Sequence, residues 1–240
     1  MTPAAAPEGA AAVFGDRLVL AERFATVLAD TGVSHGLIGP REVPRLWDRH
    51  ILNCAVIEDA FPEGARLVDV GAGAGLPGLA LAIARPDLEI HLVEPMERRT
   101  TWLTGVVEQL RLETVTVHRG RAEDLAGSLS APWVTARAVA RLDKLARWCT
   151  PLLEPGGTLV AMKGRSASDE LEADRPALTK LGLVSATVTG HGSAVLDEPV
   201  LTVDLVFEQT APRRGGRRPA AGASAGRRRP GSASGRSRRS

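Results

Sequence analysis

The stretch LVDVGAGAGLPG, residues 67–78, is the part of the sequence best suited to hold a ligand. An apolar run containing Asp69 ends in a loop with glycine at positions 71, 73, 75 and 78. Glycine has no Cβ, so a ligand can approach its backbone closely. Glu94 follows about twenty residues later, at the spacing where nucleotide-binding folds place an acid for ribose hydroxyls. The pattern therefore predicts a loop for a cofactor that contains a ribose.

Three kinds of cofactor loop compete for this stretch. A triphosphate loop, G-x-x-x-x-G-K-[ST], is excluded because no Lys followed by Ser or Thr comes after the last glycine. A dinucleotide loop, G-x-G-x-x-G, matches at Gly73, Gly75 and Gly78. That register lengthens the spacing from strand to glycine, and Pro77 falls where the helix would begin. A loop for S-adenosylmethionine does not require the third glycine, because this cofactor has no pyrophosphate.

The S-adenosylmethionine hypothesis gives each residue of the stretch a role. Gly71 and Gly73 would let the backbone lie beside the methionine part of the cofactor. Asp69 would accept a hydrogen bond from the cofactor's ammonium group or hold the loop. Glu94, at the end of the second strand in HLVEP, would accept both ribose hydroxyls, although a surface carboxylate that caps the next helix is an alternative.

Further candidates follow the third and fourth strands. Ala122 and Glu123, in RGRAEDL, could line the adenine side, and Glu123 could instead be a carboxylate at a helix N-terminus. Arg137 stands where an acceptor would meet the cofactor. It could contact the methionine carboxylate or an RNA phosphate, or form a structural ion pair.

The elements that must position these residues alternate between short apolar strands and helices. Strands are predicted at 66–70, 88–93, 114–118, 132–136, 157–162, 182–188 and 200–208. Helices are predicted between them at 77–84, 97–110, 122–127, 139–152 and 168–180. This alternation predicts an α/β fold with a mostly parallel sheet of seven strands, covered on both faces. The last two strands have no helix between them, so the last strand should run antiparallel at or near an edge.

The chain divides into four predicted segments. Residues 1–12 form a flexible N-terminus, residues 13–60 form N-terminal helices at 13–30 and 41–60, and residues 61–210 form the cofactor-binding domain. Residues 211–240 hold ten Arg, no acid, and no Leu, Ile, Val or Phe, so we expect a disordered tail. Residues 1–210 have 20 basic and 28 acidic residues, a net charge of about −8. The tail is either a tether to a polyanion such as RNA or a solvated extension.

Several classes of protein are excluded by composition. Apolar runs are interrupted well before 18 residues, so no membrane span is expected. The N-terminus lacks the basic region of a signal peptide, so we expect a cytoplasmic protein. Cys54 and Cys149 lie far apart and outside any C-x-x-C pair, which argues against a zinc site and a disulfide framework. We expect no metal and a monomer.

The stretch LVDVGAGAGLPGLALAIARPDLEIHLVEPMERRTTWL resembles the RsmG family, also called GidB, of bacterial methyltransferases. The similarity extends to RLWDRHILNCAVI, GRAEDL, VTARAVARLDKLARWC and LLEPGGTLVAMKG, and covers roughly residues 15 to 208. The resemblance implies a Rossmann-like class I methyltransferase that makes N7-methylguanosine in 16S ribosomal RNA of the small subunit. It also implies that Gly71, Leu76, Ala122, Glu123 and Arg137 contact S-adenosylmethionine, with Glu94 at the ribose. Many relatives have Asp at that position, and the Arg-rich tail lies outside the family pattern.

The residues agree with guanine N7 as the methyl acceptor. Neither cysteine stands in a Pro-Cys pair, as a carbon-5 cytosine enzyme would need, and no [ND]-P-P-[FYW] stretch follows the fourth strand, as an exocyclic-amine enzyme would show. Guanine N7 already offers a lone pair, so no general base is required. No catalytic residue is therefore assigned.

RNA would be bound by groups of neighbouring basic side chains, and the first candidates are Arg49, His50 and Lys163. His50 could instead be a core histidine, and Lys163 could instead have a structural role. The other grouped arginines are Arg41, Arg45, Arg98, Arg99, Arg137, Arg141 and Arg147. Two competing hypotheses stay open: a small-molecule methyltransferase, and an NAD- or RNA-binding module without methyl transfer.

Overall fold

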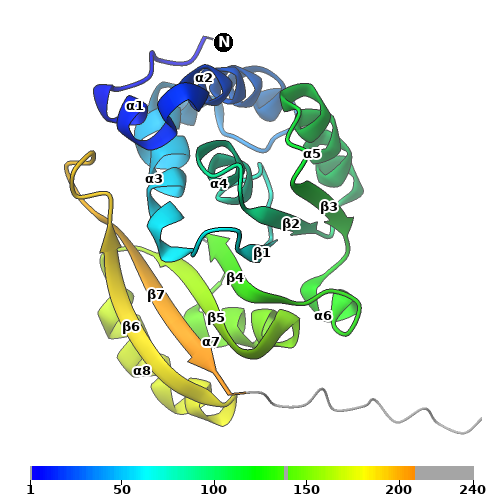
Figure 1. Cartoon of the computed structure of the whole chain (residues 1–240), viewed down its shortest axis with the longest axis vertical. Helices are drawn as coiled ribbons and strands as arrows, with labels where there is room; N and C mark the ends of the chain where they lie inside the picture. The colour runs from blue at the N-terminus through cyan, green and yellow to red at the C-terminus, as the bar shows by residue number, and fades with distance from the viewer. Residues whose placement is uncertain (1, 138–139, 209–240) are drawn as a thin grey trace, which may run out of the picture.

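A seven-stranded sheet organises the chain in the computed structural model, which describes residues 2–137 and 140–208. The strands run in the order β3-β2-β1-β4-β5-β7-β6 (Figure 1). They are β1 (Arg66–Val70), β2 (Glu89–Glu94), β3 (Val115–Arg119), β4 (Ala131–Arg137), β5 (Leu153–Lys163), β6 (Leu183–His191) and β7 (Val200–Phe207). Strands β1 to β5 pair in parallel, and β7 pairs antiparallel with both β5 and β6. The predicted α/β class and the antiparallel last strand, next to the edge strand β6, are confirmed.

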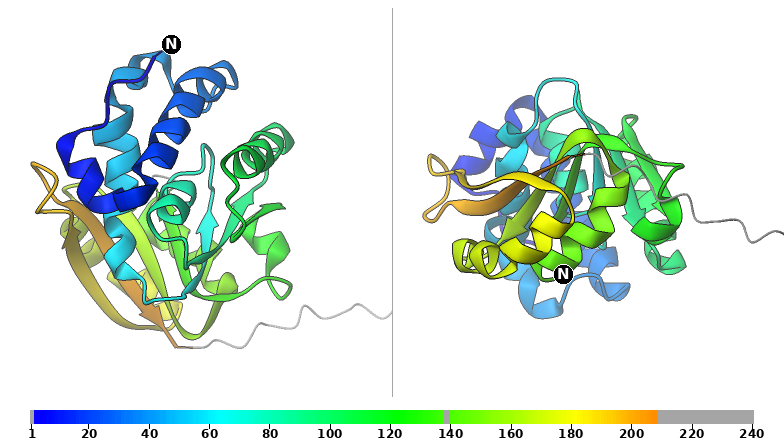
Figure 2. Two further views of the ribbon diagram at one scale, coloured as in Figure 1. Left: turned by 45° about the horizontal axis from the view of Figure 1, so that its top comes forward. Right: turned by 90° about the horizontal axis from the view of Figure 1, so that it is seen from below.

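Helices cover both faces of the sheet, and the sheet separates the hydrophobic core into two clusters. The helices of the domain are α4 (Gly78–Ala84), α5 (Glu97–Leu110), α6 (Ala122–Leu125), α7 (Leu142–Cys149), η6 (Thr150–Leu152) and α8 (Ala167–Lys180). Successive strand residues point to opposite faces. Leu67 therefore packs with α4, α5 and the N-terminal helices, whereas Val68 packs with α7 and α8. Figures 1 and 2 show the blue N-terminal helices near α4 and α5, away from α7 and α8.

The N-terminal region is a chain of short helical segments packed on α4 and α5. These are α1 (Glu8–Phe14), η1 (Gly15–Arg17), α2 (Leu18–Val27), η2 (Leu28–Gly32), η3 (Pro40–Arg45), η4 (Leu46–Ile51), α3 (Leu52–Ala55) and η5 (Val56–Ala60). They fill the predicted ranges 13–30 and 41–60. The prediction of a flexible lead-in over residues 1–12 is wrong for residues 8–12, which belong to α1. Ala10 is fully buried there, and the Trp47 indole donates to the Ala4 carbonyl at 3.1 Å.

The sequence also predicts a disordered C-terminal tail and the absence of a membrane span. No helix among the described residues is both long enough and apolar enough to cross a bilayer. The predicted disordered tail, residues 211–240, lies outside the described residues.

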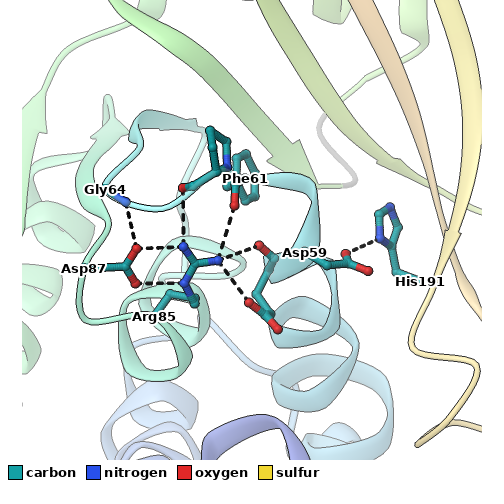
Figure 3. A network of polar contacts seen from close by, with 8 residues as sticks. Asp59, Phe61, Gly64, Arg85, Asp87 and His191 are labelled. Carbon is teal, nitrogen blue, oxygen red and sulfur yellow. Dashed lines mark hydrogen bonds and ion pairs between the residues drawn. The ribbon is translucent and has the colours of Figure 1, made fainter.

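Arg85 joins the N-terminal helices to the domain at the end of α4 (Figure 3). Its guanidinium donates to the Asp87 carboxylate at 2.8 and 2.7 Å, and Asp87 also accepts from the Gly64 amide at 2.9 Å. The Arg85 hydrogen bonds hold the pKa of Asp87 well below its usual range. The remaining acceptors of the guanidinium are the Glu58 carboxylate and the carbonyls of Glu58, Phe61 and Pro62.

A second polar contact ties η5 to the far edge of the sheet (Figure 3). The buried His191, at the end of β6, lies with Nδ1 2.6 Å from Asp59 Oδ1 and Nε2 2.9 Å from Thr202 Oγ1. A Cβ on the next residue, Gly192, would lie 2.9 Å from Val56, so glycine permits this close packing. The N-terminal helices are therefore fixed at both ends of η5.

We expect Arg85→Ala to lower the free energy of unfolding by about 2–3 kcal/mol, measured by urea denaturation. The change removes hydrogen bonds to two carboxylates and leaves the Phe61 carbonyl with no donor among the described residues, whereas the Glu58 and Pro62 carbonyls still accept from the Phe61 and Ala65 amides. Charged hydrogen bonds contribute about 1.5–3 kcal/mol each before solvent screening. Arg175→Ala is the matched control, because Arg175 makes only an exposed ion pair with Glu172 within α8. It should change stability by less than about 0.5 kcal/mol. Equal effects of the two variants would contradict the role given to Arg85.

Candidate functional site

The loop after β1 exposes backbone rather than side chains at the carboxyl edge of the sheet. Gly71, Gly73 and Gly75 have φ angles of +74°, +54° and +78°, which L side chains rarely adopt. The amides of Gly71 and Ala72 donate to the Val93 carbonyl at 2.9 and 3.1 Å, so β2 fixes the start of the loop. This geometry needs glycine and gives a ligand close access to the main chain.

Leu76 lies in this loop with its side chain buried in the core, at 4% exposure. Its amide donates to the Ala72 carbonyl at 3.2 Å. A ligand in the loop would therefore meet the backbone of Leu76, not its side chain. The residue's implied contact with a cofactor has to be a backbone contact.

Asp69 fixes the far end of the loop and keeps one oxygen without a partner. Its Oδ2 accepts from the Gly78 amide at 2.8 Å, and the whole side chain is buried. Oδ1 is buried too and has no hydrogen bond among the described residues. Burial raises the pKa of Asp69 to about 7, against the opposite effects of the Gly78 hydrogen bond and the nearby Arg137. Asp69 thus holds the loop and keeps a second carboxylate oxygen that is buried without a partner among the described residues.

Gly78 has a role that sequence reasoning treated as optional. A Cβ at this position would lie 2.3 Å from Leu92 Cδ2 and 2.8 Å from Asp69 Oδ2. The start of α4 therefore packs against the strands as closely as the third glycine of a dinucleotide loop would allow. The three-glycine register at 73, 75 and 78 reflects helix packing here and does not by itself identify the cofactor.

Glu94 lies at the end of β2, buried to 2% exposure and aimed at the loop. Its Oε2 accepts from the Gly73 amide at 3.2 Å, and its Oε1 accepts from the Met96 amide at 3.0 Å. Arg99 stands 3.6 Å from Oε2. A carboxylate has about four acceptor positions, so about two remain for hydroxyl donors. The structure thus brings Glu94 and the glycine loop together, as the spacing predicts.

The Ala122–Glu123 pair begins α6 on the neighbouring side of Glu94. The Gly120 amide donates to the Glu94 carbonyl at 3.2 Å, which ties the turn before α6 to the end of β2. Ala122 is buried and Glu123 is exposed in the first turn of the helix. The pair lies at the same sheet edge as Glu94 and the glycine loop. The position of Glu123 fits a cofactor contact and a carboxylate at a helix N-terminus equally well.

Arg137 is held in place by a chain of polar contacts from the N-terminal helices. Its guanidinium donates to His50 Nδ1 at 3.2 and 3.3 Å and to the Arg49 carbonyl at 3.2 Å. Because Nδ1 accepts, Nε2 carries the proton and donates to Glu42 Oε2 at 2.9 Å. Burial lowers the pKa of His50, which favours this neutral form, and the His50 hydrogen bond lowers the pKa of Glu42. Sequence reasoning missed Glu42, although it precedes His50 by two helical turns.

The proposed RNA-binding residues differ in what holds them. Arg49 is exposed and lies 3.7 Å from Glu42, whereas His50 is mostly buried and positions Arg137. Lys163 Nζ donates to Glu170 Oε1 at 2.8 Å and to the Ala140 carbonyl at 2.9 Å, with only 10% of its side chain exposed. His50 therefore fits the alternative of a core histidine, and Lys163 fits the alternative of a structural lysine.

A cavity of about 500 Å³ opens at the ends of β4 and β5 and brings three of the predicted residues together. Arg49, Arg137 and Lys163 all line it. A cavity of about 610 Å³ lies between α5 and β3, but none of the predicted site residues line it. The cavity beside Arg137 is therefore the one that belongs to this site.

The two cysteines are placed where neither is suited to act as a nucleophile. Cys54 and Cys149 are buried free thiols. Burial raises the pKa of Cys54 to about 11 and also raises that of Cys149, so both thiols stay protonated at neutral pH. Residues 2–137 and 140–208 contain no group of three or more His, Cys, Asp or Glu side chains placed to hold a metal ion. The site is suited to hold and align two molecules without a protein nucleophile.

Comparisons with known proteins agree with this arrangement. The model of the family described as "GidB: rRNA small subunit methyltransferase G" matches residues 17–197. A protein of Streptomyces avermitilis is 56% identical over 199 residues, covering 82% of this chain and 83% of its own length. One of Pseudarthrobacter chlorophenolicus is 54% identical over 197 residues, covering 82% and 91%. Both are named "Ribosomal RNA small subunit methyltransferase G".

Solved structures show the fold at much lower sequence identity. A putative S-adenosyl-L-methionine-dependent methyltransferase of Methanococcus maripaludis has a TM-score of 0.54 at 11% identity, covering 80% of this chain and 94% of its own. M. jannaschii TYW2, in complex with AdoMet, has a TM-score of 0.53 at 18% identity, covering 68% and 78%. The fold of this chain is the class I methyltransferase fold.

Proposed function

Because the chain belongs to the GidB family of small-subunit ribosomal RNA methyltransferases, we propose that it transfers a methyl group from S-adenosylmethionine to N7 of a guanine in 16S ribosomal RNA. The observation that carries the proposal is the pairing of the glycine loop with Glu94 at one sheet edge, beside the cavity of Arg137. A ribose-containing donor and a nucleotide acceptor would meet there.

The residues of the loop fit S-adenosylmethionine. The unpartnered Oδ1 of Asp69 would accept from its ammonium group, and buried oxygens of this kind need a donor. Glu94 would accept both ribose hydroxyls, and Gly71 and Gly73 would lie against the methionine part. The remaining contacts proposed from the family resemblance are those of Leu76, Ala122, Glu123 and Arg137.

The cofactor, when bound, supplies an electrophilic methyl group on a sulfonium. The chain's contribution is alignment, and orientation of two reactants can supply about 7–11 kcal/mol of the barrier. Arg137, fixed by His50 and the Arg49 carbonyl, would hold a carboxylate or phosphate between the loop and the cavity. Guanine N7 has no proton to lose, so a site without a free general base is adequate.

A labelling experiment tests the proposal against its rivals. The protein is incubated with methyl-labelled S-adenosylmethionine and either small ribosomal subunits, naked ribosomal RNA or a cell extract freed of RNA. Label should enter only the RNA of the first two mixtures. Label in small molecules would favour a small-molecule methyltransferase, and binding of NAD in place of S-adenosylhomocysteine by calorimetry would favour a module without methyl transfer.

We expect cofactor affinity to fall as the pH drops below about 7. Burial raises the pKa of Asp69 to about 7, so acidification protonates the oxygen that would accept from the ammonium. The dissociation constant of S-adenosylhomocysteine should rise by up to about tenfold per pH unit between pH 7 and pH 5.5. Asp69→Asn should bind more weakly and show a flat profile. A wild-type affinity that stays constant over this range would contradict the role of Asp69.

The same carboxyl affects stability in the opposite direction. Its folded pKa lies above the unfolded value, so the cofactor-free folded state binds the proton more tightly. The Asp69 contribution to stability therefore falls as the pH rises from about 4 to about 7. Cofactor binding and folding are thus distinguishable by their opposite pH trends.

The small ribosomal subunit or its precursor is the proposed partner, and the cytoplasm is the proposed location. Exposed arginines on the helical segments before α3 would meet RNA phosphates, and Arg49 is the one nearest the cavity. We propose that the chain acts as a monomer without a metal or a membrane. The Arg-rich residues 211–240 would add non-specific attraction to the RNA.

A further inference from the structure

We propose that the cavity at the ends of β4 and β5 receives the target guanine, unstacked from the RNA, and that the Asn53 carboxamide binds the base's Watson–Crick edge. The identity of the base as guanine rests on the function proposed above. The pocket itself rests on the position, size and lining of the cavity.

The cavity has the place and the size for one nucleotide. Its volume of about 500 Å³ lies within the usual range of about 300–1,000 Å³ for sites that enclose a single small ligand. β1 and β4 are parallel neighbours with Asp69 opposite Thr135, so Arg137, on the cavity wall, ends β4 at the same sheet edge where the glycine loop follows β1. A duplex does not fit such a space, whereas enzymes that modify bases commonly take one nucleotide out of the stack.

Asn53 is the one polar group on the cavity wall that the described residues leave without a hydrogen bond or an ion pair. Arg137 donates to His50, Lys163 pairs with Glu170, and Arg165 pairs with Glu198. Arg49 faces Glu42. Asn53 lies in α3, one helical turn after Arg49, is half-buried and lines the cavity. Its carboxamide is therefore free to hydrogen-bond a ligand in the cavity, with one oxygen acceptor and two N–H donors.

The chemistry of guanine matches a carboxamide at this place. For methylation N7 must face the cofactor, so the edge that carries N1–H and the N2 amine turns toward another wall of the pocket. The amide oxygen of Asn53 can accept from N1–H or the N2 amine, and its N–H can donate to O6. Met162 and Leu201 supply apolar surface for the faces of the ring, and the exposed Arg165 stands at the rim, where a backbone phosphate would lie.

The kinetics of methyl transfer to small ribosomal subunits test the assignment. Asn53→Leu should lower kcat/KM by roughly 10- to 100-fold, the usual effect of losing a bidentate base contact. Its affinity for S-adenosylhomocysteine should be unchanged. Asn53→Asp keeps an acceptor for N1–H and the N2 amine, so it should keep kcat/KM within a few fold of the wild type. Gln109→Leu, the same loss of a carboxamide on the exposed face of α5, is the matched control and should have no effect.

Two outcomes would overturn the assignment. If Asn53→Leu transfers methyl groups as the wild type does, the residue does not touch the base. If the variant loses affinity for S-adenosylhomocysteine in proportion to its activity, Asn53 belongs to the cofactor site instead. Circular dichroism and thermal unfolding confirm that the variants are folded.

A binding measurement keeps the pocket testable if the wild-type chain methylates no RNA and the proposed function fails. Asn53 is the only asparagine of the chain, so labelling with ¹⁵N-asparagine gives one side-chain amide signal in an NMR spectrum. With S-adenosylhomocysteine present, guanosine monophosphate should shift this signal more than uridine monophosphate does. A signal that neither nucleotide moves would overturn the pocket independently of activity.

Discussion

Replacement of Gly71 by valine is expected to abolish binding of S-adenosylhomocysteine, a loss of roughly 1,000-fold or more in affinity. Gly71 has a φ of +74°, and a β-branched residue in that region is strained by about 1–3 kcal/mol. The loop would have to rebuild, and its hydrogen bond to the Val93 carbonyl would be lost with it. Isothermal titration calorimetry measures the affinity, and methylation should fall with it.

Gly36→Val separates loss of the site from general backbone strain. Gly36 also has a positive φ, +66°, and a Cβ there would meet nothing within 4 Å. This variant should lose a similar amount of stability and keep its cofactor affinity. If Gly71→Val kept wild-type affinity, the loop after β1 would not be the cofactor site.

Replacement of Glu94 by alanine is the second change expected to have a large effect. It should weaken S-adenosylhomocysteine binding by roughly 100- to 1,000-fold, because two hydroxyl contacts to a carboxylate are lost at about 1.5–3 kcal/mol each, less the contribution of water that takes their place. The amides of Gly73 and Met96 also lose their acceptor, so the loop should become more mobile. Calorimetry and hydrogen exchange of the loop amides measure the two effects.

Glu89→Ala is the control for this second variant. Glu89 lies at the other end of β2, where it is exposed and pairs with His91. Its removal should leave the affinity unchanged. Glu94→Gln keeps one acceptor oxygen, so its affinity for S-adenosylhomocysteine should lie between those of Glu94→Ala and the wild type. If Glu94→Gln binds as weakly as Glu94→Ala, the negative charge of Glu94 matters more than its hydrogen-bond acceptors.

The strands could be predicted closely because buried parallel strands are continuous apolar runs between turn residues. The bounds of β1 agree with the prediction at both ends. β5 begins at Leu153, four residues before its predicted start, because Leu153 pairs with Ala131 across an irregularity in β4. The intervening Glu-Pro-Gly-Gly has low strand propensity, and only the tertiary pairing places it in the sheet.

The N-terminus shows where sequence patterns were insufficient. Residues 8–12 are alanine-rich and were included in the expected flexible N-terminus, residues 1–12. In the folded chain the loop between β6 and β7 packs on them, and a Cβ at Gly9 would lie 2.8 Å from the Val195 carbonyl. That contact joins residues far apart in sequence, and no local pattern signals it.

The site was predictable where spacing along the chain determines position. The glycine loop, Glu94, Ala122–Glu123 and Arg137 follow four parallel strands, so they had to meet at one edge. The chain from Glu42 through His50 to Arg137 was not predicted, because it depends on how the N-terminal helices pack against the sheet. A core histidine was one of the two alternatives for His50, but its role in positioning Arg137 needs the tertiary structure.

The most direct test of the account is to identify the methylated nucleoside in small ribosomal subunits. Subunits from cells that lack their own family member are treated with the protein and S-adenosylmethionine, and the 16S ribosomal RNA is digested and mapped by mass spectrometry. We predict one new N7-methylguanosine, absent when Gly71→Val replaces the wild type. A methyl group on an exocyclic amine, on a ribose or on no RNA at all would contradict the account.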